Sequence, residues 1–240
     1  MVRERLRGAK DFAFCAECGE RAVLPKADEP IQLTQSEQRK VEEQRWIAAQ
    51  RTRFEQAVFQ LASYVESQGP KRPECFISYA WGDKEQERWV ERNLATDLQK
   101  AGLGVVLDRW STRVGMSVPL FIDRIEKCDR VIVVGTPLYR RKYENQDSTM
   151  GFVVAAEVHL ISNRMLGKES KKETVLPLLL AGEEETALPP LLQRRVYADF
   201  RDERAYFITA FDLILSLYGI ASNNPAVADL RELLQERGMR

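Results

Sequence analysis

Several features are scarce in this sequence of 240 residues, and each absence excludes a class of protein. No apolar run reaches the roughly 20 residues of a membrane-spanning helix, so no membrane segment is predicted. Lys plus Arg and Asp plus Glu both number 36, so no net charge attracts nucleic acid or anionic membranes. There is one histidine, no Gly-x-Gly-x-x-Gly after the first strand and no Gly-Lys-Ser/Thr loop. Hydride transfer on a dinucleotide-binding domain and P-loop phosphoryl transfer are therefore not expected.

Cysteine is also scarce, with four residues at irregular spacing that form no disulfide framework. The first residues lack the apolar core of a secretion signal, so we expect a cytoplasmic protein. Cys15 and Cys18 form a Cys-x-x-Cys followed by Gly19, which has the shape of half a zinc site. A structural zinc normally takes four ligands, so zinc here could be completed by another chain. The alternative is a knuckle left over from a larger zinc-binding ancestor or parent protein.

The N-terminal part divides into three segments. Residues 1–33 contain turn formers and are predicted to be irregular. Thr34-Gln35-Ser36-Glu37 is a capping box, which predicts an amphipathic helix over 34–68, and residues 69–73 form a linker. An apolar stripe runs along the predicted helix: Ile47, Phe54, Val58, Leu61 and Val65. This stripe must pack on the following domain or on another copy of the helix.

From Cys75 onward, short apolar strands alternate with amphipathic helices. Strands are predicted at 75–80, 104–108, 131–136, 174–182 and, more briefly, 197–200; closing helices are predicted near 203–218 and 225–237. Continuous Val, Ile and Leu strands in this alternation predict a parallel sheet covered on both faces. The predicted fold class is therefore α/β, a flavodoxin-like three-layer sandwich with about five parallel strands, preceded by the long helix.

The carboxyl ends of parallel strands are where ligands bind in such folds. Here those ends read Ser78-Tyr79-Ala80-Trp81, Asp108-Arg109-Trp110 and Gly135-Thr136-Pro137-Leu138-Tyr139. Aromatic rings, a carboxylate and hydroxyl groups are therefore expected along one edge of the sheet. Either tryptophan alone could equally be a loop anchor that covers this edge.

Glu157 stands among apolar residues in the segment MGFVVAAEVHLI, which is residues 150–161. On a helix its neighbours at i±3 and i±4 are all aliphatic, so none can pair with a carboxylate. Because burying an unpaired charge is costly, a functional role is one explanation, and an exposed helix edge is the other. His159 lies two residues on and would point away from Glu157, so a surface or packing role is expected.

These motifs together resemble the TIR domain family, in its bacterial TIR/SEFIR-like branch. The resemblance covers residues 74–220 and rests on CFISYAWGDKE, LDRWSTRVGMSVPLFIDRIEKCDRVIVVGTPLY and STMGFVVAAEVHLI, in that order. The third motif is similar to the family's helix with the pattern Trp-Cys-x-x-Glu, although Val153 stands at the tryptophan position and Phe152 is one position off. Residues 221–240, which contain the closing helix predicted near 225–237, follow this region. The N-terminal part followed by a TIR domain is similar to the tail of large Roc-COR GTPases, so the chain is either such a tail or a free-standing relative.

Many TIR domains cleave NAD at the nicotinamide–ribose bond, and the resemblance implies that Glu157 is the catalytic residue. The binding residues that it implies are Ser78, Tyr79, Ala80, Trp81, Asp108, Trp110, Thr136, Tyr139 and Phe152. NAD would be the substrate of a bacterial immune or signalling effector, and the product would be ADP-ribose or a cyclic isomer. Sites in this family are often completed between copies, so self-association is expected. The alternatives are an adaptor that acts through contacts between TIR domains, and a sensor that binds a nucleotide without cleaving it.

Overall fold

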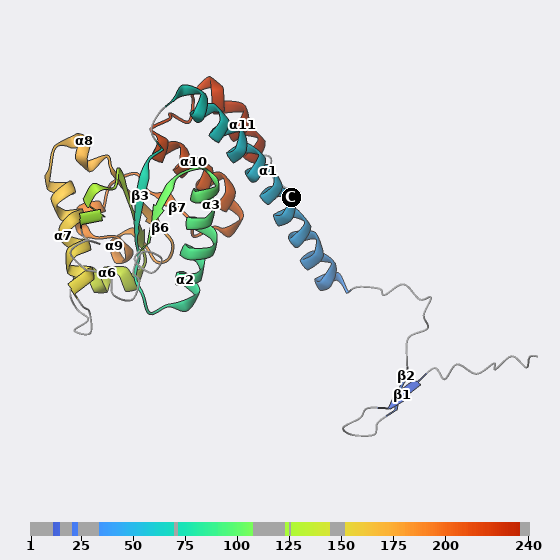
Figure 1. The fold of residues 1–240 in the computed structure, drawn as a ribbon. Helices are drawn as coiled ribbons and strands as arrows, with labels where there is room; N and C mark the ends of the chain where they lie inside the picture. The colour runs from blue at the N-terminus through green and yellow to red at the C-terminus, as the bar shows by residue number, and fades with distance from the viewer. Residues whose placement is uncertain are drawn as a thin grey trace, which may run out of the picture. The chain divides into compact units, whose positions relative to one another are not determined.

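The computed structural model describes residues 12–14, 21–23, 34–69, 72–107, 123–124, 126–144 and 152–235, with the backbone alone at 12–14, 21–23 and 152–157. The chain forms two units, Met1–Arg45 and Trp46–Arg240 (Figure 1).

The first unit contains a short hairpin and the beginning of a long helix. Strand β1 (Phe12–Phe14) pairs antiparallel with β2 (Arg21–Val23). The sequence analysis predicted irregular structure over 1–33 and did not include these two strands. Helix α1 (Gln35–Gln68) follows, and its capping box is confirmed. The Thr34 N–H donates to Glu37 Oε2 at 2.8 Å, and the Glu37 N–H donates to Thr34 Oγ1 at 3.4 Å. Cys15 and Cys18 lie outside the described residues, so zinc binding stays a prediction.

A parallel sheet forms the centre of the second unit. Its strands are β3 (Glu74–Ser78), β4 (Gly104–Val106), β5 (Arg130–Gly135), β6 (Val175–Leu179) and β7 (Ala198–Asp199). The spatial order is β4-β3-β5-β6-β7, and every neighbouring pair is parallel. This is the strand order of a flavodoxin-like sheet, so the predicted fold class is confirmed.

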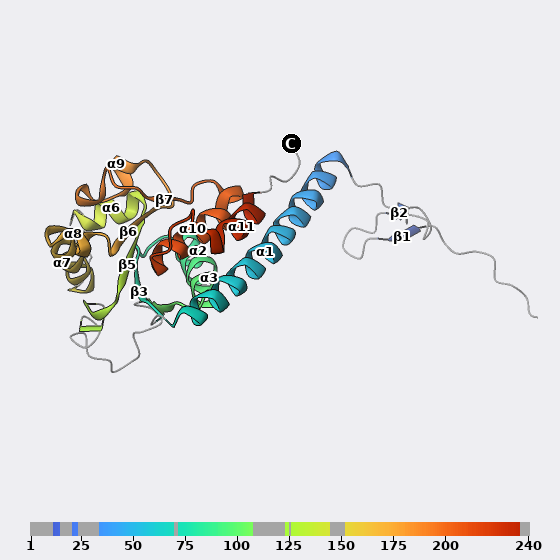
Figure 2. The ribbon, with the colours of Figure 1, turned by 90° about the horizontal axis from the view of Figure 1, so that it is seen from above.

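Helices cover both faces of this sheet (Figure 2). The helical segments are α2 (Lys84–Trp89), a π-helical turn (Val90–Leu94), α3 (Ala95–Lys100), α6 (Pro137–Tyr143), α7 (Phe152–Leu166), α8 (Glu169–Lys172), α9 (Glu184–Ala187), 3₁₀ turns at Pro190–Leu192 and Glu203–Ala205, α10 (Tyr206–Tyr218) and α11 (Pro225–Gln235). One face packs against α1, α3, α10 and α11, and the other against α6 and α7. The three layers are thus complete.

The strands supply alternate side chains to the two faces. Ile77 and Ile132 are buried among the residues of α1, α3 and α10, whereas Phe76 and Val133 are buried among those of α6 and α7. Successive side chains of a strand point to opposite faces, so strands covered on both sides must be apolar throughout. This explains why these segments have no polar period.

From Trp46 onward α1 belongs to the second unit and packs on the domain that follows it. Phe54 and Leu61 are fully buried, and the Phe54 ring lies 5.6 Å from that of Phe207 on α10. Ile47, in the predicted stripe, is instead 47% exposed. Of the two partners expected for the stripe, the following domain is therefore the one that residues 54–65 contact.

A charged cluster fixes α1 to this face. Arg51 Nη1 lies 2.6 Å from Asp97 Oδ1, and the Tyr206 hydroxyl donates to Asp97 Oδ2 at 2.7 Å. The Arg51 guanidinium also lies 4.9 Å from the centre of the Phe207 ring, a cation–π distance. Asp97, which is 2% exposed, thus accepts hydrogen bonds from one donor on α1 and one on α10.

Candidate functional site

Two neighbouring strands place hydroxyl groups together at the carboxyl end of the sheet. Ser78 ends β3 and is 1% exposed, and its Oγ lies 2.9 Å from the hydroxyl of Tyr139 on α6. Thr136, directly after β5, caps α6 because its Oγ1 accepts the Tyr139 N–H at 3.0 Å. Pro137 at the first helical position favours this start. The cap thus fixes the backbone of Tyr139, whose hydroxyl contacts Ser78.

The turn after β3 carries an exposed tryptophan and is held from two sides. Trp81 is 42% exposed, and its carbonyl accepts a hydrogen bond from Lys142 Nζ on α6. The Gly82 N–H donates to Glu87 Oε1 on α2 at 2.8 Å, and Gly82 has a φ of +118°, which only glycine adopts readily. These bonds hold the backbone that carries the indole.

The predicted binding residues do not all lie on one face. Ala80 and Tyr139 pack with the α6 and α7 side, whereas Tyr79 packs in the opposite core, where its hydroxyl donates to Glu91 Oε1 at 3.3 Å. The alternation of side chains along an extended segment accounts for this separation. Asp108 and Trp110 lie outside the described residues.

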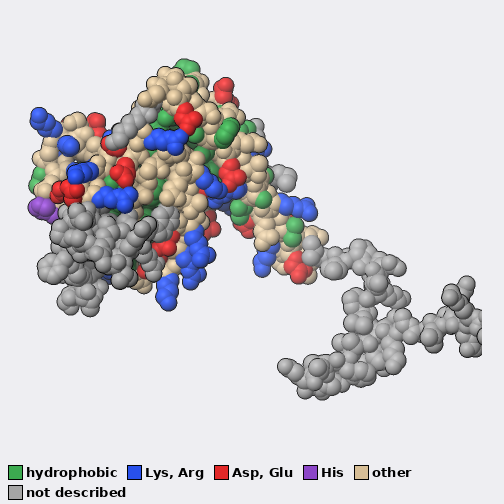
Figure 3. All heavy atoms as spheres, viewed as in Figure 1, with side chains coloured by type: hydrophobic (Ala, Val, Ile, Leu, Met, Phe, Trp, Pro, Cys, Tyr) green, Lys and Arg blue, Asp and Glu red, His purple; other side chains and the backbone are tan. Residues whose placement is uncertain are grey.

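Helix α7 carries the candidate catalytic residue. The side chains of Glu157 and Phe152 lie outside the described part of this helix. Farther along it, Leu160, Ile161, Arg164 and Met165 are buried, whereas His159, Asn163 and Leu166 are exposed. Position 157 comes one turn before Ile161 and two turns before Arg164, which are both buried. The exposure of His159, the purple residue in Figure 3, agrees with its predicted surface role.

Arg164, farther along α7, is a buried cation that the sequence analysis did not consider. It is 9% exposed, and its Nη2 donates to the carbonyls of Glu126 at 3.1 Å and Cys128 at 2.7 Å. Its Nη1 donates to Thr174 Oγ1 at 3.2 Å. Burial lowers the pKa of this guanidinium below its ordinary value. The available signal was its spacing, because Arg164 falls seven residues after Glu157 in an otherwise apolar stripe.

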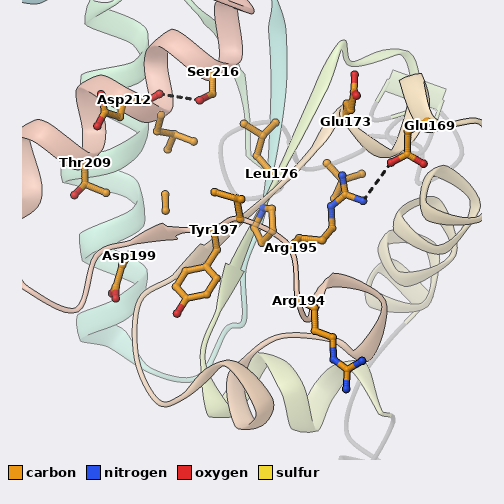
Figure 4. A pocket seen from close by; sticks show the side chains of 15 residues that line it. Glu169, Glu173, Leu176, Arg194, Arg195, Tyr197, Asp199, Thr209, Asp212 and Ser216 are labelled. Atoms are coloured by element: carbon orange, nitrogen blue, oxygen red, sulfur yellow. Dashed lines mark hydrogen bonds and ion pairs between the residues drawn. The ribbon is translucent and has the colours of Figure 1, made fainter. Parts of the chain in front are cut away.

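A hollow of ≈ 770 Å³ lies elsewhere, beside the amino-terminal half of β6 (Figure 4). Its lining residues are Glu169, Glu173, Val175, Leu176, Pro177, Arg194, Arg195, Val196, Tyr197, Ala198, Asp199, Thr209, Asp212, Leu213 and Ser216. None of the predicted site residues is among them. Some of its charged groups are engaged in ion pairs: Arg195 lies 4.0 Å from Glu169, and Asp212 lies 2.7 Å from Arg231. The hollow is therefore separate from the candidate site at the carboxyl ends.

Three further observations concern metal ions, membranes and surface charge. Among them, no group of three or more His, Cys, Asp or Glu side chains is placed to hold a metal ion. No helix in the same part of the chain has the length and apolar character to cross a membrane. On the face shown in Figure 3, acidic and basic side chains are interspersed.

Comparison with known proteins decides the family. A family model described as a TIR domain matches residues 75–215. This chain belongs to the TIR domain family. A crystal structure of a prokaryotic SEFIR domain is also similar, with a TM-score of 0.48 and 25% sequence identity over 61% of this chain and 99% of that one. No curated protein matches. Membership of the TIR family supports a signalling or adaptor function, and TIR domains commonly associate with one another.

Proposed function

We propose that this TIR domain is an NAD glycohydrolase, with Glu157 as the catalytic residue. The observation that carries the proposal is the pattern of burial along α7. The residues one and two turns after position 157, Ile161 and Arg164, are 0% and 9% exposed. A carboxylate on that face of the helix would lie in surroundings of low polarity, where its field is strong.

The chemistry requires such a carboxylate. When the bond between nicotinamide and ribose C1′ breaks, the bonding electron pair leaves with nicotinamide and positive charge develops on the ribose. A fixed anion beside the ribose stabilises this oxocarbenium-like state more than it stabilises the bound substrate. Water then adds to C1′ and loses a proton, which gives ADP-ribose. The same electrostatic principle operates in glycosidases.

Other residues at this end of the sheet suit a dinucleotide. The exposed indole of Trp81 stands on a turn held by α2 and α6, and a flat base can stack on such a ring. Ser78 and Tyr139 place two hydroxyl groups 2.9 Å apart at the same end of the sheet, and hydroxyls can donate to and accept from a sugar. We propose these three residues as binding groups, together with Asp108 and Trp110.

The decisive experiment measures nicotinamide release from NAD by concentrated protein, with and without a crowding agent. We expect the wild-type chain to release nicotinamide and Glu157→Gln to lose at least about 100-fold in kcat, because the amide has the size of the acid but no charge. His159→Gln is the matched control, since His159 is exposed on the same helix. It should retain wild-type activity and the same thermal stability.

An inactive wild type at all concentrations would contradict the enzymatic proposal, as would an active Glu157→Gln variant. If the wild type is inactive yet associates with itself in sedimentation experiments, a non-catalytic adaptor function explains the data better. Tight binding of NAD without release of nicotinamide would instead support a nucleotide sensor. Activity that rises more steeply than protein concentration would support a site completed by self-association.

A further inference from the structure

We propose that Arg164 is a positioning residue that holds α7 in the rotation required by the carboxylate of Glu157. This inference rests on the proposed function. Arg164 lies two turns after Glu157 on the same helix, and its guanidinium joins α7 to the segments that enter two neighbouring strands of the sheet.

The contacts of Arg164 connect three parts of the chain. Its Nη2 reaches the carbonyl oxygens of Glu126 and Cys128, at 3.1 and 2.7 Å, just before β5 begins. Its Nη1 reaches the Thr174 hydroxyl at 3.2 Å, just before β6 begins. The guanidinium is planar and rigid, so donation in two directions specifies the orientation of the helix as well as its distance from the sheet.

Attachment of the helix alone does not explain an arginine at this position. Leu160, Ile161 and Met165 are already buried against the same face of the sheet and supply apolar contact. Its hydrogen-bond acceptors are two backbone carbonyls and one hydroxyl, all neutral oxygens, while the carboxylates of Asp129 and Glu126 act on it at longer range. Because a buried charged donor left without acceptors is costly, the guanidinium favours the arrangement of α7 that supplies these three oxygens.

The orientation set at Arg164 extends to position 157. Seven residues of α-helix make almost two turns and span about 10 Å, so the two positions differ in direction by only about 20°. A short stretch of helix twists little, and rotation of α7 at Arg164 would therefore carry Glu157 with it. Displacement of a catalytic group by about 1 Å can cost about 100-fold in rate.

The experiment uses the full chain and compares Arg164→Met with Arg164→Lys. Methionine keeps a comparable length but removes every donor, and lysine keeps the charge but has no fork. We expect kcat for nicotinamide release to fall about 10- to 100-fold in Arg164→Met and by a smaller factor in Arg164→Lys. KM should change less than about threefold in both, because the binding residues at β3 and α6 are untouched.

Two measures distinguish a positioning role of Arg164 from a contribution to stability alone: the assay temperature and a control variant. Activities are measured well below each variant's own thermal midpoint, where the folded fraction is complete. Arg231→Met is the control, since Arg231 makes two hydrogen bonds to Asp212, which join α11 to α10, far from α7 in sequence. It should keep the wild-type kcat. Hydrogen exchange of the amides in 152–166 should be faster in Arg164→Met and unchanged in the control.

The possible outcomes distinguish failure of the proposed function from failure of the role of Arg164. An inactive wild type overturns the proposed function and this inference with it. An active wild type together with Arg164→Met at wild-type kcat overturns the role of Arg164 alone. A lower kcat that disappears on cooling, with unchanged exchange in α7, would show that Arg164 contributes only to stability and would also overturn it.

Discussion

At the scale of single residues, the buried polar groups of the second unit hold elements together. Asp97 is the clearest case, because it accepts hydrogen bonds from Arg51 on α1 and from Tyr206 on α10 while it is 2% exposed. Removing water from a carboxylate costs several kcal/mol, which the bonds from Arg51 and Tyr206 must offset. The ion pair of Arg51 with Asp97 therefore contributes more to the docking position of α1 than to net stability.

Substitution of Arg51 by Met should destabilise the protein by about 3–5 kcal/mol, because Asp97 would stay buried without its cation. The double variant Arg51→Met, Asp97→Leu should recover at least half of that loss, since no buried charge remains. Urea unfolding measures both. Arg231→Met is the control, and it should cost less than about 1 kcal/mol because its partner Asp212 is partly exposed. Equal losses in Arg51→Met and the control would contradict this account.

At the scale of elements, the strength of the sequence signal decided which features were predictable. Most strands were predicted within a few residues because they are continuous apolar runs beside turn residues, and α1 was predicted because its apolar stripe is long. The short helices α6, α8 and α9 were not predicted, since segments of four to seven residues have too little periodicity. The contact of Ser78 with Tyr139 was not predicted either, because it joins residues 61 apart.

Two phenylalanines test the docking of α1. Phe54 is fully buried, whereas Phe59 on the same helix is 73% exposed. Phe54→Ala should lower the free energy of unfolding by about 3–5 kcal/mol through the loss of buried surface and the cavity left behind. Phe59→Ala should change it by less than about 0.5 kcal/mol. Chemical denaturation followed by circular dichroism gives both values, and a large effect of Phe59→Ala would point to a second surface packed on α1.

At the scale of the whole molecule, the charges are balanced. The formal net charge is zero and the sequence pI is ≈ 6.7, so long-range attraction of charged partners of either sign is weak.

Buried thiols affect how the stability of the protein depends on pH. Burial raises the pKa of Cys75 to about 12 and that of Cys128 to about 12. Burial, together with the Asp97 carboxylate, also raises the pKa of Tyr206. All three groups are therefore protonated in the folded protein at pH 9.

These raised pKa values predict a loss of stability in alkali. The unfolded thiol ionises near pH 8.5, so its contribution is complete below that pH and is lost as pH rises toward the folded pKa of about 12. At pH 10 the loss should be about 2 kcal/mol for Cys75. Urea unfolding at pH 7.5 and pH 10 measures it. Cys75→Ala should show a smaller difference between the two pH values, and an unchanged difference would contradict the assignment.

The sequence by itself determined the layers of this protein. Apolar strands without a polar period require helices on both faces. The role proposed for Glu157 came from its apolar neighbours in sequence and from the family resemblance, and it stays a prediction. Only the tertiary structure decided which side chains meet. It separated Tyr79 from Ser78 and Ala80, joined Ser78 to Tyr139, and placed Arg164 against the strand entries, because contacts between distant residues depend on how helices dock and not on local pattern.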